Sequence, residues 1–279
     1  MSRELVVRLA SFIAVSFAMA VWETAAPRRP RIVSRAIRWP ANLGILAFDT
    51  TLVRLLFAAL PFAIAVKTGE QGWGLLNAYP LPFWMKGVGG VILLDFVIYL
   101  QHVMFHAVPL FWRFHMMHHA DLDFDFTTGG RFHPVEILLS MGIKMAAVAA
   151  LGPPPIAVLL FEVLLNATSM FNHGNVSLPP AVDGVLRFIV VTPDMHRVHH
   201  SVIPRETNSN FGFNLPWWDR IGGTYRDQPS MGHDAMTIGL AQFQEERRQT
   251  LPWLLLLPFR GSAGRYPIGR SGSRGAESR

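Results

Sequence analysis

The chain has 279 residues, of which 51% are hydrophobic and 16% are charged, whereas about 25% of the residues in an average soluble domain are charged. This balance disfavours a soluble enzyme and favours a membrane protein. The formal net charge is +6, and the chain has no cysteine, which excludes disulfides, cysteine-bound iron–sulfur clusters and cysteine zinc sites.

Five apolar stretches approach the ~20 residues that a helix needs to cross a bilayer. They cover residues 5–22, 43–66, 83–101, 135–151 and 156–172. The last two are short and are joined by the helix-breaking segment Gly152-Pro153-Pro154-Pro155. We therefore expect a helical hairpin that either spans the membrane or enters it and returns. Its interior Lys144 and Glu162 need polar partners.

An arginine cluster after the first stretch predicts the orientation of the chain. It consists of Arg28, Arg29, Arg31, Arg35 and Arg38. Such a cluster beside a span is normally retained in the cytoplasm, so it indicates a membrane surface and not nucleic acid. Counting spans forward then places every histidine on the cytoplasmic side of a bacterial inner membrane or its equivalent. The alternative is that the first stretch is a signal peptide with a cleavage site at Ala18-Met19-Ala20.

The predicted fold is an all-α membrane bundle of four to five membrane segments with a histidine-rich helical cap in the cytoplasm. Residues 1–82 would form N-terminal membrane helices and an arginine-rich cytoplasmic loop, and residues 83–250 the catalytic domain. Residues 251–279 would form an interfacial segment, which is too short to span, and a tail that we expect to be disordered from residue 260.

Nine of the eleven histidines fall into four groups. The groups are His102 and His106; His115, His118 and His119; His173; and His196, His199 and His200. Because residues three and four apart share a helix face, each H-x-x-x-H or H-x-x-H-H group directs its imidazoles at one point. Nitrogen donors suit iron, zinc, copper or nickel, and nine donors exceed what one zinc ion takes. The pattern therefore predicts a site for two metal ions.

Asp95 is a candidate for orienting these ligands. It precedes His102 by two helical turns and so faces the same way. A metal-bound imidazole usually donates its other N–H group to a carboxylate or carbonyl, and an unpaired carboxylate in the membrane is costly. We therefore expect Asp95 to orient His102 or His106.

Other polar residues near the histidines have structural interpretations. Thr192 and Pro193 predict the start of the helix that carries the last histidine group, with Asp194 in its first turn, and capping is the favoured role of Asp194. His133, directly before Pro134, is either structural or close to the metal, with the structural role favoured. His233 is expected on the surface.

These motifs resemble those of the fatty acid hydroxylase and sterol desaturase superfamily of integral membrane enzymes. The resemblance covers residues 90–226 and runs through Asp95…Tyr99-Leu-Gln-His102-x-x-x-His106, Trp112-Arg-Phe-His115-Met-Met-His118-His119, Arg131-Phe-His133-Pro134-x-Glu136, Asn172-His173, Thr192-Pro-Asp-Met-His196-Arg-Val-His199-His200 and Asn210-Phe-Gly…Trp218-Asp219-Arg220-Ile-Gly-Gly-Thr224. One departure is Val103, where many members have arginine. The resemblance implies that the nine grouped histidines bind two irons, and it adds Asn172 and Asp219 to the candidate supporting residues. It also implies that O2 is activated there and that a C–H bond of a lipid is hydroxylated or desaturated, with hydroxylation narrowly favoured.

The electrons for such a reaction would come from a separate donor, such as a ferredoxin, a cytochrome or a reductase. The sequence has no cysteine for a cluster and no convincing dinucleotide-binding motif after a strand. A basic face of Arg197, Arg205, Arg220 and Arg226 could dock an acidic carrier, although solvated or lipid-facing arginines are the more common interpretation.

Three alternatives also gather histidines beside membrane helices. A divalent-metal transporter or metal-binding membrane protein is the first, but transport favours ligands near the midplane on broken helices. A b-type haem carrier would leave most of the nine histidines without a role. An inactive homologue of the same superfamily is the third.

Overall fold

The computed structural model describes residues 3–57, 60–260 and 262–268, and within these ranges regular structure is helical, with isolated β-bridges only. Five segments are long and apolar enough to cross a membrane. They are α1 (Arg3–Ala25), the segment Arg35–Gln71, α4 (Phe83–Ala107), α6 (Pro134–Leu151) and α7 (Pro155–Asn172). The expectation of an all-α membrane bundle with a cluster of histidines is confirmed.

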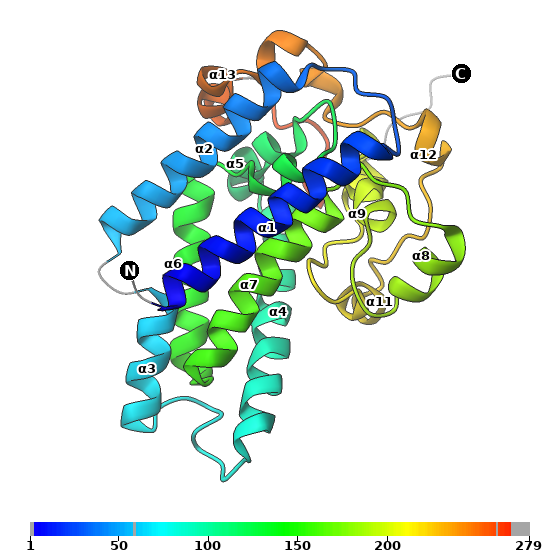
Figure 1. Ribbon diagram of the computed structural model, residues 1–279. Helices are drawn as coiled ribbons and strands as arrows, with labels where there is room; N and C mark the ends of the chain where they lie inside the picture. The colour runs from blue at the N-terminus through cyan, green and yellow to red at the C-terminus, as the bar shows by residue number, and fades with distance from the viewer. Residues whose placement is uncertain (1–2, 58–59, 261, 269–279) are drawn as a thin grey trace.

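Four helices form the body of the bundle and two others cross it. In Figure 1, α3 (Pro61–Gln71), α4, α6 and α7 run side by side in the lower half, whereas α1 and α2 (Arg35–Leu56) cross them obliquely. Helix α1 packs against α7, and α2 packs against α6. Large apolar side chains on the outside, such as Phe17, Leu55 and Phe83, are exposed, as expected for surfaces that face lipid.

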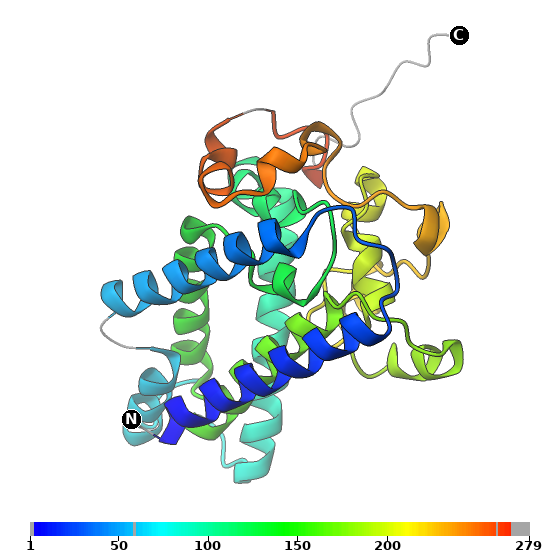
Figure 2. The same cartoon turned by 45° about the horizontal axis from the view of Figure 1, so that its top comes forward.

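The predicted span over residues 43–66 falls within the candidate membrane segment Arg35–Gln71, where the described residues form two helices and not one. Helix α2 begins at Arg35, where the Ser34 hydroxyl accepts a hydrogen bond from the Ala36 amide at 3.2 Å, and it ends at Leu56. Helix α3 starts anew at Pro61 and takes a different direction (Figure 2). Proline favours the first turn of a helix because it lacks an N–H group. Because α2 begins at Arg35, this residue lies in a helix and not in the predicted cytoplasmic loop.

The hairpin of α6 and α7 has the predicted turn and the predicted polar pair. Gly152 ends α6 in the left-handed conformation, with φ 63°, and a side chain there would meet the Trp73 carbonyl oxygen at 2.2 Å. Lys144 Nζ lies 3.3 Å from Glu162 Oε1, so these two interior charges do find polar company. The hairpin is thereby held together at its turn and along its length.

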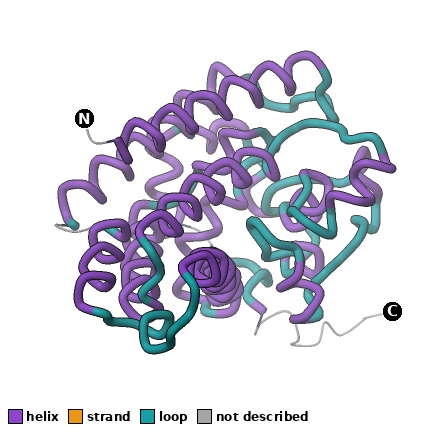
Figure 3. Tube along the Cα trace, turned by 60° about the horizontal axis from the view of Figure 1, so that its bottom comes forward, coloured by secondary structure: helices purple, strands orange, loops and turns teal. Residues whose placement is uncertain are grey.

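The cap consists of short helices joined by loops, which gather on one side of the molecule (Figure 3). Proline occupies the start of several of these helices, which fixes where each begins. Its elements are α5 (Pro109–His119), η1 (Phe126–Gly130), α8 (Pro180–Leu186), α9 (Pro193–His199), α10 (Pro204–Thr207), α11 (Trp217–Gly222), α12 (Gly232–Ala235), η2 (Ala241–Phe243), η3 (Glu246–Gln249), α13 (Leu251–Leu256) and η4 (Leu257–Phe259).

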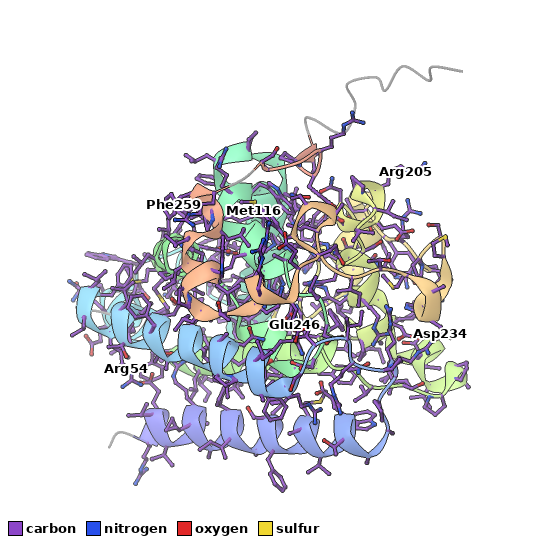
Figure 4. The ribbon with its side chains drawn as sticks, turned by 90° about the horizontal axis from the view of Figure 1, so that it is seen from above. Arg54, Met116, Arg205, Asp234, Glu246 and Phe259 are labelled. Atoms are coloured by element: carbon purple, nitrogen blue, oxygen red, sulfur yellow. The ribbon has the colours of Figure 1, made fainter. Side chains whose placement is uncertain are left out.

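The C-terminal segment packs on the cap further than predicted. The Trp112 indole stacks on Tyr266 at 5.6 Å between ring centroids and donates to the Ala263 carbonyl at 3.0 Å. Met116 joins this cluster and lies beneath the segment that carries Glu246 and Phe259 (Figure 4). The prediction of a disordered tail is therefore wrong for residues 260 and 262–268, and its remainder, residues 261 and 269–279, lies outside the described residues.

Candidate metal centre

The structure brings the nine grouped histidines together at the junction of bundle and cap. Helix α4 carries two of them, α5 three, the C-terminus of α7 one, and α9 with its C-cap three. All nine are at most 2% exposed. They separate into a five-histidine group, His102, His106, His115, His119 and His199, and a four-histidine group, His118, His173, His196 and His200.

The Nε2 atoms of the five-histidine group face one another at short range. The Nε2 atom of His102 lies 3.1 Å from that of His115 and 3.0 Å from that of His199. The Nε2 atom of His119 lies 3.2 Å from those of His106 and His115. Nitrogens at ~2.1 Å from one ion lie ~3.0 Å apart at neighbouring octahedral positions, so these separations suit a shared cation.

The four-histidine group repeats this arrangement. The Nε2 atom of His173 lies 3.1 Å from those of His118 and His196. The fourth member, His200, is fully buried, and neither of its ring nitrogens has a hydrogen-bond partner among the described residues. A buried polar atom without a partner is costly, and metal coordination would satisfy it.

Hydrogen bonds at the other ring nitrogen fix the tautomer of several imidazoles. The Nδ1 atoms of His102, His173 and His199 each lie 2.7 Å from a backbone carbonyl oxygen, those of Phe211, Ser169 and Ser209. A carbonyl only accepts, so Nδ1 carries the hydrogen and Nε2 carries a lone pair. Lone pairs that face each other at 3.0–3.2 Å repel unless a cation lies between them.

Burial keeps the imidazoles neutral. Outside the membrane segments, loss of hydration lowers the pKa of His173 to about 3 and lowers the pKa values of His118 and His196 well below the ordinary value. Neutral imidazole is the form that binds metal. The donor set therefore fits two transition-metal ions, and neutral nitrogen donors do not by themselves select iron over zinc.

Glu136 is a supporting residue that the sequence interpretation did not single out. Its Oε1 atom accepts from His115 Nδ1 at 2.7 Å, and both side chains are buried. Its place in the Arg131–Glu136 motif was the available signal, because a carboxylate at the start of an apolar helix needs a polar partner. His106 uses an amide instead, since its Nδ1 atom lies 3.0 Å from Asn208 Oδ1.

The prediction that Asp95 orients His102 or His106 is wrong as a direct contact. The Asp95 carboxylate accepts from the Trp218 indole at 2.8 Å and from the Leu215 amide at 3.2 Å. Asp95 shares a helix face with His102, but its carboxylate is bound instead by Leu215 and Trp218, which lie far along the chain. Asp95 thus fastens the cap to α4.

Asp219 and Asn172 hold the loop that orients His102. The Asp219 carboxylate accepts from the amides of Phe211 at 2.8 Å and Gly212 at 2.7 Å. Asn172 donates to the Phe213 carbonyl at 3.1 Å. Because the Phe211 carbonyl accepts from His102, both residues act on the site through this loop.

The remaining candidates lie outside the two groups. Thr192 caps α9, with its hydroxyl 3.5 Å from the Met195 amide, so the predicted helix start is confirmed, whereas Asp194 in the first turn pairs with Arg197. His133 caps α6, accepting from the Val135 amide at 3.2 Å, which is the structural role. His233 is 7% exposed, so its expected surface position is wrong.

A buried ion-pair network supports the segment after the second histidine group. Arg38 on α2 donates to Asp121 through Nε at 2.7 Å and to Asp125 through Nη1 at 2.5 Å. Burial alone would raise the pKa of Asp121, but Arg38 and Arg131 lower it well below the ordinary value. The alternating Asp121-Leu-Asp-Phe-Asp125 pattern was the sequence signal for this network. Arg38 was predicted to lie in the arginine-rich cytoplasmic loop, but it is a buried helix residue.

Arg197 does not belong to a basic docking face. Its side chain is fully buried, pairs with Asp194, donates to the Gly174 carbonyl at 3.3 Å and lies over the Phe124 ring. Arg205 is exposed at the edge of the cap (Figure 4). The predicted four-arginine face is therefore wrong at Arg197.

A cavity of about 580 Å³ leads from the membrane helices to the histidines. Of the nine, only His102 and His115 line it, and Glu136 lies beside them. Its walls come from α1, α2, α4, α6 and α7 and include apolar side chains such as Phe105 and Met141. The volume lies in the range of sites for small organic ligands.

Comparison with known proteins agrees with this geometry. Residues 87–224 match the model of the family described as "Fatty acid hydroxylase". No solved structure matches the chain significantly. Over 153 residues the chain is 31% identical to ornithine lipid hydroxylase of Rhizobium tropici, which covers 55% of this chain and 45% of the relative.

Two further relatives are eukaryotic. Alkylglycerol monooxygenase of Xenopus tropicalis is 30% identical over 151 residues, 52% of this chain and 31% of the relative. Methylsterol monooxygenase 2-2 of Arabidopsis thaliana is 28% identical over 170 residues, 59% of this chain and 63% of the relative. The matches thus span less than two thirds of each relative. Through residues 87–224, which contain all nine grouped histidines, the chain belongs to the fatty acid hydroxylase family.

Proposed function

We propose that this integral membrane protein is an O2-dependent di-iron enzyme that hydroxylates a C–H bond of a membrane lipid. The observation that carries the proposal is the set of Nε2 lone pairs that face one another in two buried groups of five and four imidazoles. Five and four donors are fewer than the six of an octahedral ion, which leaves positions for other ligands. The hydroxylase and monooxygenase names of the relatives favour oxygenation over metal transport or desaturation.

The protein's own residues supply position and environment. Iron at the two groups would provide the activation of O2, with electrons from a donor such as a ferredoxin, a cytochrome or a reductase. Carbonyl oxygens and Glu136 orient the imidazoles, and burial keeps them neutral and excludes water. His102 and His115 face the cavity, so an alkyl chain that fills the cavity ends beside them.

The substrate would enter from the bilayer. The cavity opens among helices with exposed apolar surfaces, and a molecule already dissolved in the membrane reaches it most easily. We place the histidines on the cytoplasmic side, because the arginine cluster after α1 favours retention there. Residues 83–250 would form the catalytic domain.

Comparative lipid mass spectrometry tests the proposal. Cells that express the protein should contain a lipid that is heavier by one oxygen atom, and growth under heavy-isotope O2 should label that atom. A His118→Ala variant should lack the product, whereas His233→Ala, outside both groups, should keep it. A product lighter by two hydrogen atoms would mean desaturation, and no altered lipid would contradict the proposed activity.

A further inference from the structure

Six charged side chains line the cavity in addition to Glu136. They are Glu4, Arg8, Asp49, Arg54, Lys144 and Glu162, which we call the charged cluster. Ionisable groups within membrane segments are costly and usually serve a function. The charged cluster holds three acids and three bases, so its formal charges balance.

Four members of the charged cluster form ion pairs that join α1 to the hairpin. Glu162 pairs with Lys144 at 3.3 Å and also with Arg8, and Arg8 pairs with Glu4 at 2.9 Å. The side chains of Arg8 and Glu4 stay 25% and 26% exposed, and those of Lys144 and Glu162 stay 13% and 7% exposed. All four line the cavity, so these groups can exchange partners with a ligand there.

Asp49 is the buried acid of the charged cluster that has no hydrogen-bond partner among the described residues. It is 3% exposed, and neither carboxylate oxygen has a hydrogen-bond partner among the described residues. Arg54, toward the C-terminal end of the same helix, also lines the cavity (Figure 4). A buried carboxylate without a hydrogen-bond donor is costly, so we expect a ligand in the cavity to donate a hydrogen bond to Asp49.

The ion pairs lie at a different level of the cavity from the histidines. On α6, Lys144 lies eight residues beyond Glu136, a rise of about 12 Å along the helix. Ile137, Met141 and Leu165 line the cavity between these levels. An amphiphile with its polar end at the ion pairs would therefore lay its alkyl chain along this wall toward His102 and His115.

We propose that the charged cluster binds the zwitterionic headgroup of a lipid and so sets which carbon reaches the histidines. This inference rests on the proposed function. A headgroup with one cation and one anion finds an opposite partner for each charge, because both acids and bases line the cavity. A headgroup with a net charge would leave one charge uncompensated in a medium of low dielectric constant, which is unfavourable.

Binding of three amphiphiles with the same hexadecyl chain tests this inference. The probes are hexadecylphosphocholine, which is zwitterionic, hexadecyl phosphate, which is anionic, and 1-hexadecylglycerol, which is neutral. Equilibrium binding of radiolabelled probes to the full chain in a non-ionic detergent should favour the zwitterion by at least about tenfold. Equal binding of all three, or preference for either of the others, would overturn the inference.

Two variants separate recognition from helix packing. Asp49→Asn removes a buried carboxyl group that has no hydrogen-bond partner among the described residues, so it should raise the melting temperature of the ligand-free protein while it weakens the zwitterion's binding about tenfold. Glu162→Gln should weaken the same binding and lower the preference for the zwitterion over the neutral probe. A purely structural ion pair would change the binding of all three probes alike, and that result would refute the proposal.

A matched control and a second readout complete the design. Asp183→Asn breaks an ion pair with Arg187 in the cap, away from the cavity, and should leave the preference unchanged. If the preference holds but the iron-loaded protein oxidises no lipid, the proposed function fails and the headgroup site stands. If lipids are oxidised at a rate that does not depend on headgroup charge, the headgroup site is refuted and the proposed function stands.

Discussion

The Glu136 carboxylate on α6 accepts the Nδ1 hydrogen of His115 on α5 across 2.7 Å, so a membrane helix orients a histidine of the cap. Loss of such a partner generally lowers metal affinity about 10- to 100-fold. Glu136→Ala should show this loss in metal titrations of the purified protein. Glu136→Gln keeps an acceptor and should lose less. Full affinity in the alanine variant would show that His115 needs no orientation.

Removal of one imidazole from each group should have distinct effects on metal content. His119→Ala leaves four donors in the five-histidine group, whereas His200→Ala leaves three in the four-histidine group. We expect the His200 variant to lose more metal, measured by elemental analysis against protein concentration, and both variants to lose lipid oxidation. His133→Ala is the control, because His133 caps α6 and belongs to neither group. Equal, complete metal content in all three would contradict the assignment.

Arg38 should matter for stability far more than its sequence context suggests. It is fully buried between Asp121 and Asp125, and removal of one partner from a buried ion pair generally costs about 3–5 kcal/mol. Arg38→Met should therefore lower the thermal unfolding midpoint in detergent by many degrees. Arg247→Met breaks an exposed pair with Glu245 and should leave the midpoint unchanged. Similar midpoints for the two variants would argue against the network.

Acid should destabilise the metal-free protein. Burial lowers the pKa of His173 to about 3, whereas an unfolded histidine titrates near 6.5. Between these values the unfolded chain binds more protons than the folded one, so stability falls as the pH drops below about 6.5. Chelator-treated protein should melt at lower temperature at pH ~5 than at pH ~7.5, and metal should shift the midpoint back at the higher pH. A midpoint that is independent of pH would mean that the histidines are hydrated.

The sequence could predict the histidine groups because their spacing is local. Three and four residues place imidazoles on one helix face, and α4, α5 and α9 are helices where that spacing requires them. The division into five and four could not be predicted. It depends on how α5 sits between its partners, which sends His118 to one group and His119 to the other.

Where prediction failed, distant residues changed the outcome. The spacing from Asp95 to His102 is correct for a shared face, but Trp218, 123 residues further along, donates to the carboxylate. Arg38 was assigned by its neighbours in the sequence, and its true partners are 83 and 87 residues away. Such pairings arise only when the cap closes on the bundle.

Helix α9 supplies donors to both groups, His199 to one and His196 with His200 to the other. A nascent polypeptide that has not yet extended past this helix lacks three of its nine nitrogens and cannot complete either pocket. Under the proposed function, both metal sites would therefore form only after α9 has been synthesised and has folded against α4, α5 and α7.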